Sequence, residues 1–286
     1  MKIVDDFKDY SLINTSNGQK LEKWGKYITL RPDPQIIWQS NLDFSNYDAK
    51  YERSKSGGGS WSVINKNMKD SWQIKYKDYT FNLKLMSFKH TGLFPEQAYN
   101  WNYIEDIIKK SKRNDIKVLN LFAYTGAASI AALHAGASVV HVDSSRGMID
   151  WAKENVKSSN LDDKPIRFLQ DDVVKFVKRE IRRGNKYDII IMDPPSFGRG
   201  ASGEVWDIEK SLFELVSLCK ELLSENPLMF LINSYTTGLS KSVFENVLKI
   251  VLQDSLGGHI ESDEIGIKQD NSNIVLPCGN FARWEY

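Results

Sequence analysis

Four short segments carry residue types that suit the binding of a nucleoside and a planar substrate. They are FAYTG at 122–126, Asp143, the Asp-Asp pair at 171–172, and DPPSF at 193–197. The glycine at the end of the first segment lets the backbone turn tightly beside a ligand, and a helix that starts there offers unpaired N–H groups. Asp143 lies seventeen positions past Gly126, where a carboxylate can accept both hydroxyls of a ribose.

Each segment also has an ordinary structural explanation. A turn of small residues after a strand is common, Asp143 can be a polar strand end, Asp172 can cap a helix, and Asp-Pro-Pro can be a rigid turn. The functional interpretation is favoured because each segment follows a predicted strand. In an open α/β sheet, ligands bind beyond the carboxyl ends of the strands.

The elements that position these segments alternate between strand and helix from residue 95 onwards. Strands are expected at 117–122, 138–143, 166–169, 187–192 and 228–233, and helices at 95–110, 127–135, after Ser144 or Ser145, and at 172–183, 208–224 and 241–253. Two closing strands are expected at 262–268 and 272–285. This order predicts an α/β fold with a doubly wound, mostly parallel sheet.

The amino-terminal part has a different composition. Strands are expected at 27–30 and 36–38, and a hairpin at 72–76 and 81–85, since apolar residues alternate there. We therefore expect two domains: a small antiparallel β domain at 1–88, and a ligand-binding α/β domain at 89–286.

Composition excludes several classes of protein. The chain has 286 residues, a net charge of +1 and 41% hydrophobic residues, which is ordinary for a globular protein. There are two cysteines, no apolar run long enough to span a membrane and no metal-ligand spacing. The charged start at residues 1–10 has no apolar stretch, so we expect no signal peptide. We expect a cytoplasmic protein without a membrane or metal partner, and the sequence does not indicate its oligomeric state.

The cofactor class follows from an absence in the sequence. It has no G-x-G-x-x-G motif, which a bound pyrophosphate needs for close approach of the backbone. S-adenosylmethionine has no phosphate, so one glycine is enough for it.

Taken together, the motifs resemble those of class I S-adenosylmethionine-dependent methyltransferases. The resemblance rests on LNLFAYTG at 119–126, Val142-Asp143, Asp172 and DPPSF, and covers about residues 88–286 well. GLFPEQ at 92–97, FGRGASGEVW at 197–206 and NSYTTG at 233–238 resemble the bacterial large-subunit ribosomal RNA methyltransferases in particular. The resemblance implies a Rossmann-like fold, S-adenosylmethionine as cofactor and RNA, most plainly ribosomal RNA, as partner.

Site residues follow from the resemblance and from the chemistry of each side chain. Asp143 is expected to hold the ribose, Met148 to pack on the adenine, Asp172 to accept its amino group, and Gln97 to hydrogen-bond the cofactor. The full set of cofactor-binding residues is Phe94, Pro95, Gln97, Asn120, Phe122, Ala123, Tyr124, Gly126, Asp143, Ser144, Met148, Asp172 and Asp193.

The acceptor is expected beside the Asp-Pro-Pro segment. Asp193 and the Pro194 carbonyl would accept hydrogens from an exocyclic amine and hold its nitrogen nearer the tetrahedral shape needed for attack. Phe197 would stack on a flipped base. The expected catalytic residues are Asp193, Pro194, Pro195 and Phe197, and the expected substrate-binding residues are Ser196, Phe197 and Arg199.

Three alternatives stay open at this point. The acceptor can be a small molecule or a protein, or the chain can be a nucleotide-binding module without catalysis. Methylation at a pyrimidine C5 would need a thiolate, for which Cys278 is the better candidate because Cys219 lies on an apolar helix face. For RNA capture, the aromatic strands of the amino-terminal domain and the loop 51–60 carry Lys50, Arg53 and Lys55.

Overall fold

Two units make up the chain in the computed structural model, which describes residues 1–286 except 41–43, 55–57, 87 and 201–202. The first consists of Met1–Tyr99 with Gly266–Cys278, and the second of Asn100–Ile265 with Gly279–Tyr286. Composition predicts a boundary at residue 88, whereas the first unit runs on to Tyr99 and also includes residues 266–278. These residues bond to the first unit, where Leu12 O accepts Asp270 N at 2.8 Å.

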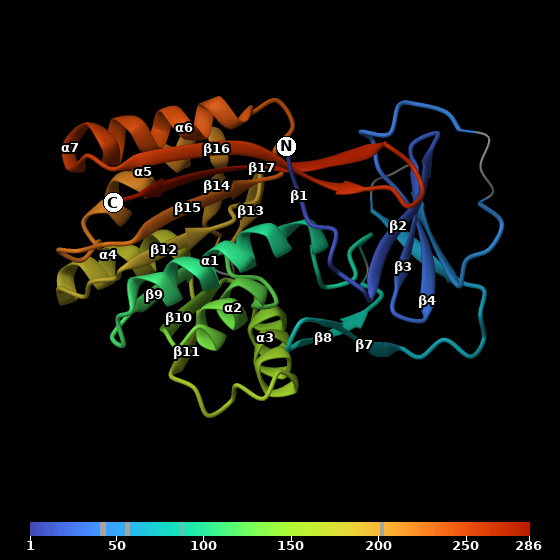
Figure 1. Ribbon diagram of the computed structural model, residues 1–286, viewed down its shortest axis with the longest axis horizontal. Coiled ribbons are helices and arrows are strands. Elements are labelled where there is room, and N and C mark those ends of the chain that lie inside the picture. Colours follow the sequence, from blue (N-terminus) through green and yellow to red (C-terminus); the bar gives the residue numbers. More distant parts are fainter. Residues whose placement is uncertain (41–43, 55–57, 87, 201–202) are drawn as a thin grey trace. The chain divides into compact units, whose positions relative to one another are not determined.

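The second unit is built on a large sheet with strand order β16-β17-β15-β12-β9-β10-β11. The strands from β15 to β11 are parallel, and β17 runs antiparallel to β15 (Figure 1). The strands are β9 (Lys117–Leu121), β10 (Ser138–Asp143), β11 (Ile166–Gln170), β12 (Ile189–Met192), β15 (Met229–Ser234), β16 (His259–Lys268) and β17 (Val275–Glu285). The expected doubly wound, mostly parallel sheet is therefore confirmed.

Helices cover both faces of this sheet. One face packs α4, α5 and α6 into an apolar core with Leu121, Ile190 and Phe230. Asn120 and His141 point to the other face, because strand side chains alternate, and there they meet α2. The helices are α1 (Ala98–Ser111), α2 (Ala127–His134), α3 (Arg146–Ser158), α4 (Val173–Arg183), α5 (Ile208–Lys220), α6 (Lys241–Leu248) and α7 (Asp254–Leu256), with a π-helical turn η2 (Lys249–Gln253) between the last two.

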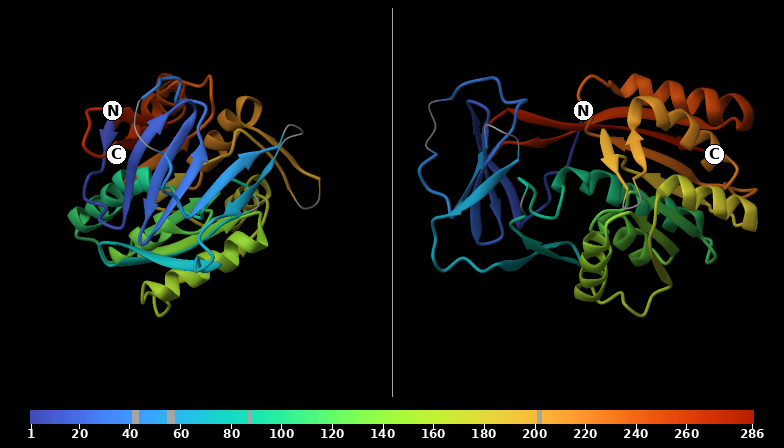
Figure 2. Two further views of the ribbon diagram at one scale, coloured as in Figure 1. Left: turned by 90° about the vertical axis from the view of Figure 1, so that its right-hand side faces the viewer. Right: turned by 180° about the vertical axis from the view of Figure 1, so that it is seen from behind.

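The first unit contains a five-stranded sheet and a separate hairpin. The sheet order is β2-β3-β4-β5-β6, and Figure 2 shows these strands face-on. Its strands are β2 (Tyr10–Ser16), β3 (Gln19–Trp24), β4 (Tyr27–Pro32), β5 (Ala49–Arg53) and β6 (Gly59–Val63). The hairpin is β7 (Ser71–Tyr76) and β8 (Tyr79–Lys84). In the chain, β1 (Lys2–Ile3) precedes β2, and the 3-10 turn η1 (Pro95–Gln97) follows the hairpin.

One sequence prediction for this unit is wrong. Residues 36–38 are not a strand: the carbonyls of Ile36 and Trp38 accept the backbone N–H groups of the turn at 17–18, and Ile37 is 89% exposed. The expected antiparallel sheet is confirmed, with one parallel pair, β4 and β5. The segment that joins these two strands is long enough to carry the chain back to the starting end. The predicted hairpin at 72–84 is confirmed.

Candidate cofactor and acceptor site

Strand register brings the predicted segments to one edge of the sheet. Leu121, the last residue of β9, pairs with Val142 on one side and with Met192 on the other. Asp143 pairs with Gln170 at the end of β11. The residues that follow these strand ends therefore lie on neighbouring strands, as expected for a ligand site of this fold.

The loop after β9 has a strained backbone that the surrounding structure fixes. Phe122 and Tyr124 adopt left-handed conformations, with φ of 52° and 51°, and Gly126 has a φ of 90°. A left-handed residue other than glycine costs about 1–2 kcal/mol and clusters at functional sites. Asn155 Nδ2 donates to Thr125 O at 2.9 Å, and Ala123 N donates to Val142 O at 3.0 Å. The loop is thus held in one shape by neighbouring elements.

The Asp143 carboxylate holds this loop in place through backbone hydrogen bonds. Its Oδ2 accepts Tyr124 N and its Oδ1 accepts Ser145 N, both at 2.9 Å. Burial raises the pKa of this carboxyl, and the two backbone N–H groups oppose that shift. Each carboxylate oxygen has a second lone pair, so Asp143 can accept ribose hydroxyls while it orders the loop.

The helix after β10 is capped by Ser145 rather than Ser144. Ser145 Oγ accepts Met148 N at 3.4 Å. Ser144 is exposed and Met148 is half-buried. Both therefore present some surface next to Asp143, and their contact with the cofactor stays a prediction.

Asn120 belongs to a buried network beneath the loop. Its Nδ2 donates to Ser129 Oγ at 3.0 Å, and that hydroxyl lies 3.0 Å from His141 Nδ1. Burial lowers the pKa of His141 to about 3, so the ring is neutral near pH 7. The network supports β9 and β10 from the α2 face. A direct contact of Asn120 with a ligand stays a prediction.

Gly126 has a packing role beside its conformational one. A Cβ at this position would lie 3.1 Å from the Cβ of Ala152 in α3. Its absence lets α2 and α3 approach closely at the start of α2. The sequence predicts only that Gly126 allows a tight turn and a close approach of the backbone to a ligand.

The two aspartates after β11 are both engaged. Asp172 caps α4, since its Oδ1 accepts Lys175 N at 2.9 Å. Asp171 pairs with Arg179 of the same helix. The capping explanation of Asp172 is confirmed. Its second oxygen is the one that would reach an adenine amino group.

The Asp-Pro-Pro segment is held by a hairpin that the sequence did not predict, formed by β13 (Phe197–Arg199) and β14 (Val205–Asp207). Trp206 Nε1 donates to Pro195 O at 2.7 Å, and its ring lies 4.9 Å from that of Phe122. Trp206 therefore connects the loop after β9 with the segment after β12. The one sequence signal was a tryptophan inside FGRGASGEVW.

The other members of this segment differ in burial. Pro194 is buried, whereas Pro195, Ser196 and Arg199 are exposed, and Phe197 is 57% exposed. Ser196 Oγ lies 2.7 Å from Thr236 Oγ1, which connects the segment to NSYTTG at the end of β15. Residues 201–202 of the stretch at 197–206 lie outside the described residues, as does Lys55 of the loop 51–60.

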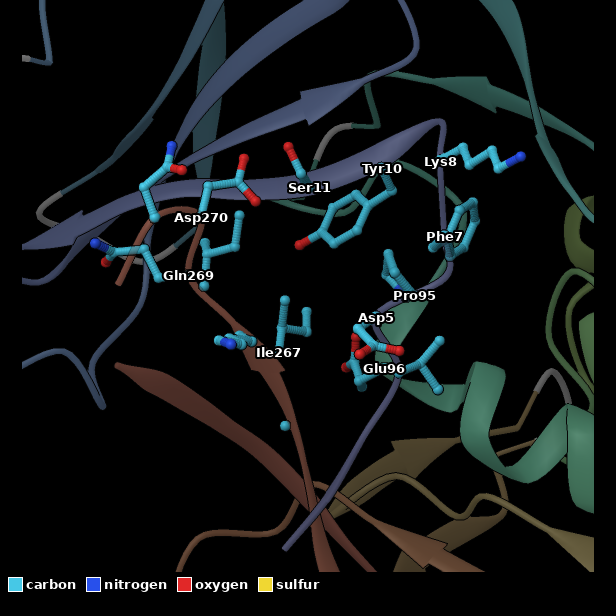
Figure 3. A pocket seen from close by; sticks show the side chains of 15 residues that line it. Asp5, Phe7, Lys8, Tyr10, Ser11, Pro95, Glu96, Ile267, Gln269 and Asp270 are labelled. Atoms are coloured by element: carbon cyan, nitrogen blue, oxygen red, sulfur yellow. The ribbon is translucent and has the colours of Figure 1, made fainter. Parts of the chain in front are cut away.

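The turn at 94–97 lies in the first unit. Pro95 and Gln97 are buried in η1, and the Phe94 ring lies 5.4 Å from that of His90. A cavity of about 330 Å³ in the same unit is lined by Pro95 and Glu96, together with Asp5, Tyr10 and Asp270 (Figure 3). Contact of Phe94, Pro95 and Gln97 with the cofactor stays a prediction.

Neither cysteine has the environment of an activated thiolate. Burial raises the pKa of Cys219 and of Cys278, and the nearby Glu96 adds to the shift at Cys278. Within the described part of the chain, no group of His, Cys, Asp or Glu side chains could hold a metal ion. Over the same residues, no helix is long and apolar enough to cross a membrane.

Comparison with known proteins gives consistent matches. A family model described as S-adenosylmethionine-dependent methyltransferase matches residues 50–245. The crystal structure of a SAM-dependent methyltransferase from Agrobacterium tumefaciens is 35% identical with a TM-score of 0.94, and the match covers 99% of this chain and 92% of that one.

Two curated relatives are named ribosomal RNA large subunit methyltransferase K/L. The one from Shewanella frigidimarina is 36% identical over 148 residues, which are 51% of this chain and 20% of the relative. The one from Syntrophotalea carbinolica is 28% identical over 188 residues, which are 65% and 25%. The match spans a quarter or less of the length of these relatives.

Proposed function

Because the chain belongs to the family of S-adenosylmethionine-dependent methyltransferases, we propose that it methylates a base of ribosomal RNA. The observation that carries the proposal is that Asp143 and Asp193 lie at the ends of β10 and β12, the two strands that flank β9, with the exposed Phe197 following Asp193 in the chain. In this proposal Asp143 binds the cofactor and Asp193 binds the acceptor.

The residues present fit this cofactor. Asp143 retains lone pairs for two hydroxyls, and the loop at 122–126 has the single glycine that a phosphate-free ligand requires. The residues that would hold the cofactor are those of the loop, with Asp143, Met148 and Asp172. When bound, S-adenosylmethionine supplies an electrophilic methyl group on a sulfonium centre.

Asp193 and Pro194 would orient the acceptor. A carboxylate and a carbonyl accept the two hydrogens of an exocyclic amine, which directs the nitrogen lone pair out of the plane of the ring. Fixing two reactants in line can supply about 7–11 kcal/mol of the barrier. The proton lost from the nitrogen passes to Asp193 or to water. Because the pKa values of both thiols are raised, methylation of a nitrogen is favoured over methylation of a pyrimidine C5, which would need a thiolate.

RNA is favoured as acceptor over a small molecule or a protein. Two curated relatives carry the name of a ribosomal RNA methyltransferase. In this chain an exposed aromatic, Phe197, and an exposed cation, Arg199, flank the Asp-Pro-Pro segment. An aromatic ring can stack on a flipped base, and a cation can contact a phosphate. An enzyme of ribosomal RNA would act in the cytoplasm.

Nucleoside mass spectrometry tests the proposal. Ribosomal RNA from a strain that lacks the gene is expected to miss one methylated nucleoside, which the purified protein restores with S-adenosylmethionine. Cys278→Ser is expected to restore it at the wild-type rate. An identical nucleoside profile with and without the gene, and no transfer in vitro, would overturn the ribosomal RNA assignment.

A further inference from the structure

The first unit exposes an aromatic ring among cations. Phe88 is 60% exposed, and Lys89 follows it in the chain. Arg53 ends β5, and Trp61 lies on β6, the partner strand of β5. We call Arg53, Trp61, Phe88 and Lys89 the aromatic–cation surface.

The main chain that presents Phe88 and Lys89 is held from two directions. Trp61 Nε1 donates to the carbonyl oxygens of Met86 and Phe88, at 2.8 and 3.2 Å. Arg31 Nη1 donates to Lys89 O at 2.9 Å. Arg31 is itself fixed by two hydrogen bonds to the buried Glu22, of 2.5 and 2.6 Å. An exposed ring on a fixed backbone loses little entropy when a ligand packs on it.

Charge at this surface is unbalanced. Burial lowers the pKa of Lys89, Asp33 opposes that shift, and the cations Lys20, Arg31 and Arg53 add to it. Burial together with Arg31, Lys89 and Lys20 also lowers the pKa of His90, to about 4.

The nearby acids are already engaged. Glu22 pairs with Arg31, Asp33 with Lys20, and Glu52 with Lys50. Within the described residues, neither Lys89 nor Arg53 forms an ion pair. The surface therefore attracts an anion beside an exposed ring.

We propose that the aromatic–cation surface binds a single-stranded segment of RNA, with a base stacked on Phe88 and phosphates at Lys89 and Arg53. A single strand offers flat bases and a polyanionic backbone together, and proteins bind such strands through aromatic platforms in positive grooves. A folded acidic protein would match the cations but has no regular flat face for Phe88. The inference rests on the proposal that the acceptor is RNA.

Binding of a fluorescein-labelled 12-nucleotide single-stranded RNA to the full chain, followed by anisotropy, tests this inference. Phe88→Ala is expected to weaken binding about tenfold, because stacking of one base accounts for roughly 5- to 150-fold in affinity. Lys89→Met is expected to weaken binding and to reduce the slope of log K against log salt by about 0.7, the value for one lost contact with a single strand.

Matched controls separate this surface from general effects. Ile64→Ala removes another exposed apolar side chain, and Lys23→Ala another exposed cation of the first unit; both are expected to bind RNA as the wild type does. S-adenosylmethionine affinity, measured by calorimetry, is expected to be the same in all variants.

Wild-type RNA affinity and salt slope in both Phe88→Ala and Lys89→Met would overturn the inference. A loss in Lys89→Met alone, with heparin competing as well as RNA, would overturn stacking on Phe88. Because the assay needs no catalysis, its failure is distinguishable from an unchanged nucleoside profile, which tests the proposed function.

Discussion

The loop after β9 and the segment after β12 occupy neighbouring strand ends but are built differently. The first is fixed by hydrogen bonds to Asp143 and Val142 and from Asn155, and its backbone is strained at Phe122 and Tyr124. The second ends in exposed residues on a hairpin of two three-residue strands. Its main attachments are Trp206 to Pro195 O and Ser196 to Thr236.

This difference matches the tasks we propose for the two regions. A cofactor of constant shape is bound best by a site that is already formed, since no ordering free energy is then lost on binding. A nucleic-acid acceptor must enter and leave, so its contacts lie on exposed side chains. If this comparison is right, substitutions in the two regions will separate cofactor affinity from turnover.

The largest effect is expected at Asp193. Asp193→Ala removes the acceptor for the amine hydrogens, and turnover is expected to fall on the order of 100- to 1000-fold, as when one preorganised polar group is removed from an active site. Cofactor affinity, measured by calorimetry, is expected to stay within about twofold. Asp193→Asn, which keeps the shape but not the charge, serves as the matched variant. Near-wild-type turnover in Asp193→Ala would break the assignment of Asp193 to the acceptor.

Asp143→Ala is expected to act on cofactor affinity. Loss of hydrogen bonds to a charged group costs about 1.5–3 kcal/mol, which corresponds to a ten- to hundredfold weaker S-adenosylmethionine affinity by calorimetry. Asp150→Ala removes a carboxylate exposed on α3, where it pairs with Arg146 and Lys153, and is the control. Equal affinities in both variants would show that Asp143 orders a strand end and nothing more.

Gly126 and Gly136 form a matched pair for the packing beneath the loop. Their φ values are 90° and 96°, but a Cβ would meet Ala152 at 3.1 Å only at Gly126, since none of the described atoms lies within 4 Å at Gly136. Gly136→Ala is expected to lower the free energy of unfolding by about 1 kcal/mol, the cost of a left-handed alanine. Gly126→Ala is expected to lower it by about 1 kcal/mol more. Urea denaturation measures both free energies of unfolding. Equal decreases in the two variants would show that the close approach of α2 and α3 does not require a glycine at position 126.

The smallest effect is expected at Trp206. Trp206→Phe keeps a ring against Phe122 but loses the hydrogen bond to Pro195 O, worth about 1 kcal/mol. We expect kcat to fall about fivefold while cofactor affinity is unchanged. A weakened cofactor affinity instead would show that the two regions form one unit, contrary to the comparison above.

Most of the second unit could be predicted because its signals are local. The strand at 138–143 and the cap at Asp172 depend on alternation and on side chains three residues from their partners. The hairpin at 197–207 was missed because strands of three residues are too short to show an alternating pattern. Trp206 was missed as a connector because its partners, Pro195 and Phe122, meet it only through tertiary structure. The parallel pairing of β4 with β5 likewise depends on the path of the intervening chain.

The return of Gly266–Cys278 to the first unit has a consequence for synthesis of the protein. Thr15 Oγ1 donates to Gln269 Oε1 at 2.6 Å across 254 residues of sequence. At about 5–20 residues per second, a ribosome needs roughly 13–50 s to deliver the second partner after the first. During that time β2, an outer strand of its sheet, lacks the chain that will bond Leu12 and Thr15. The nascent protein therefore carries an open β edge, which is a site for aggregation or for chaperone binding, until residues 266–278 have been synthesised.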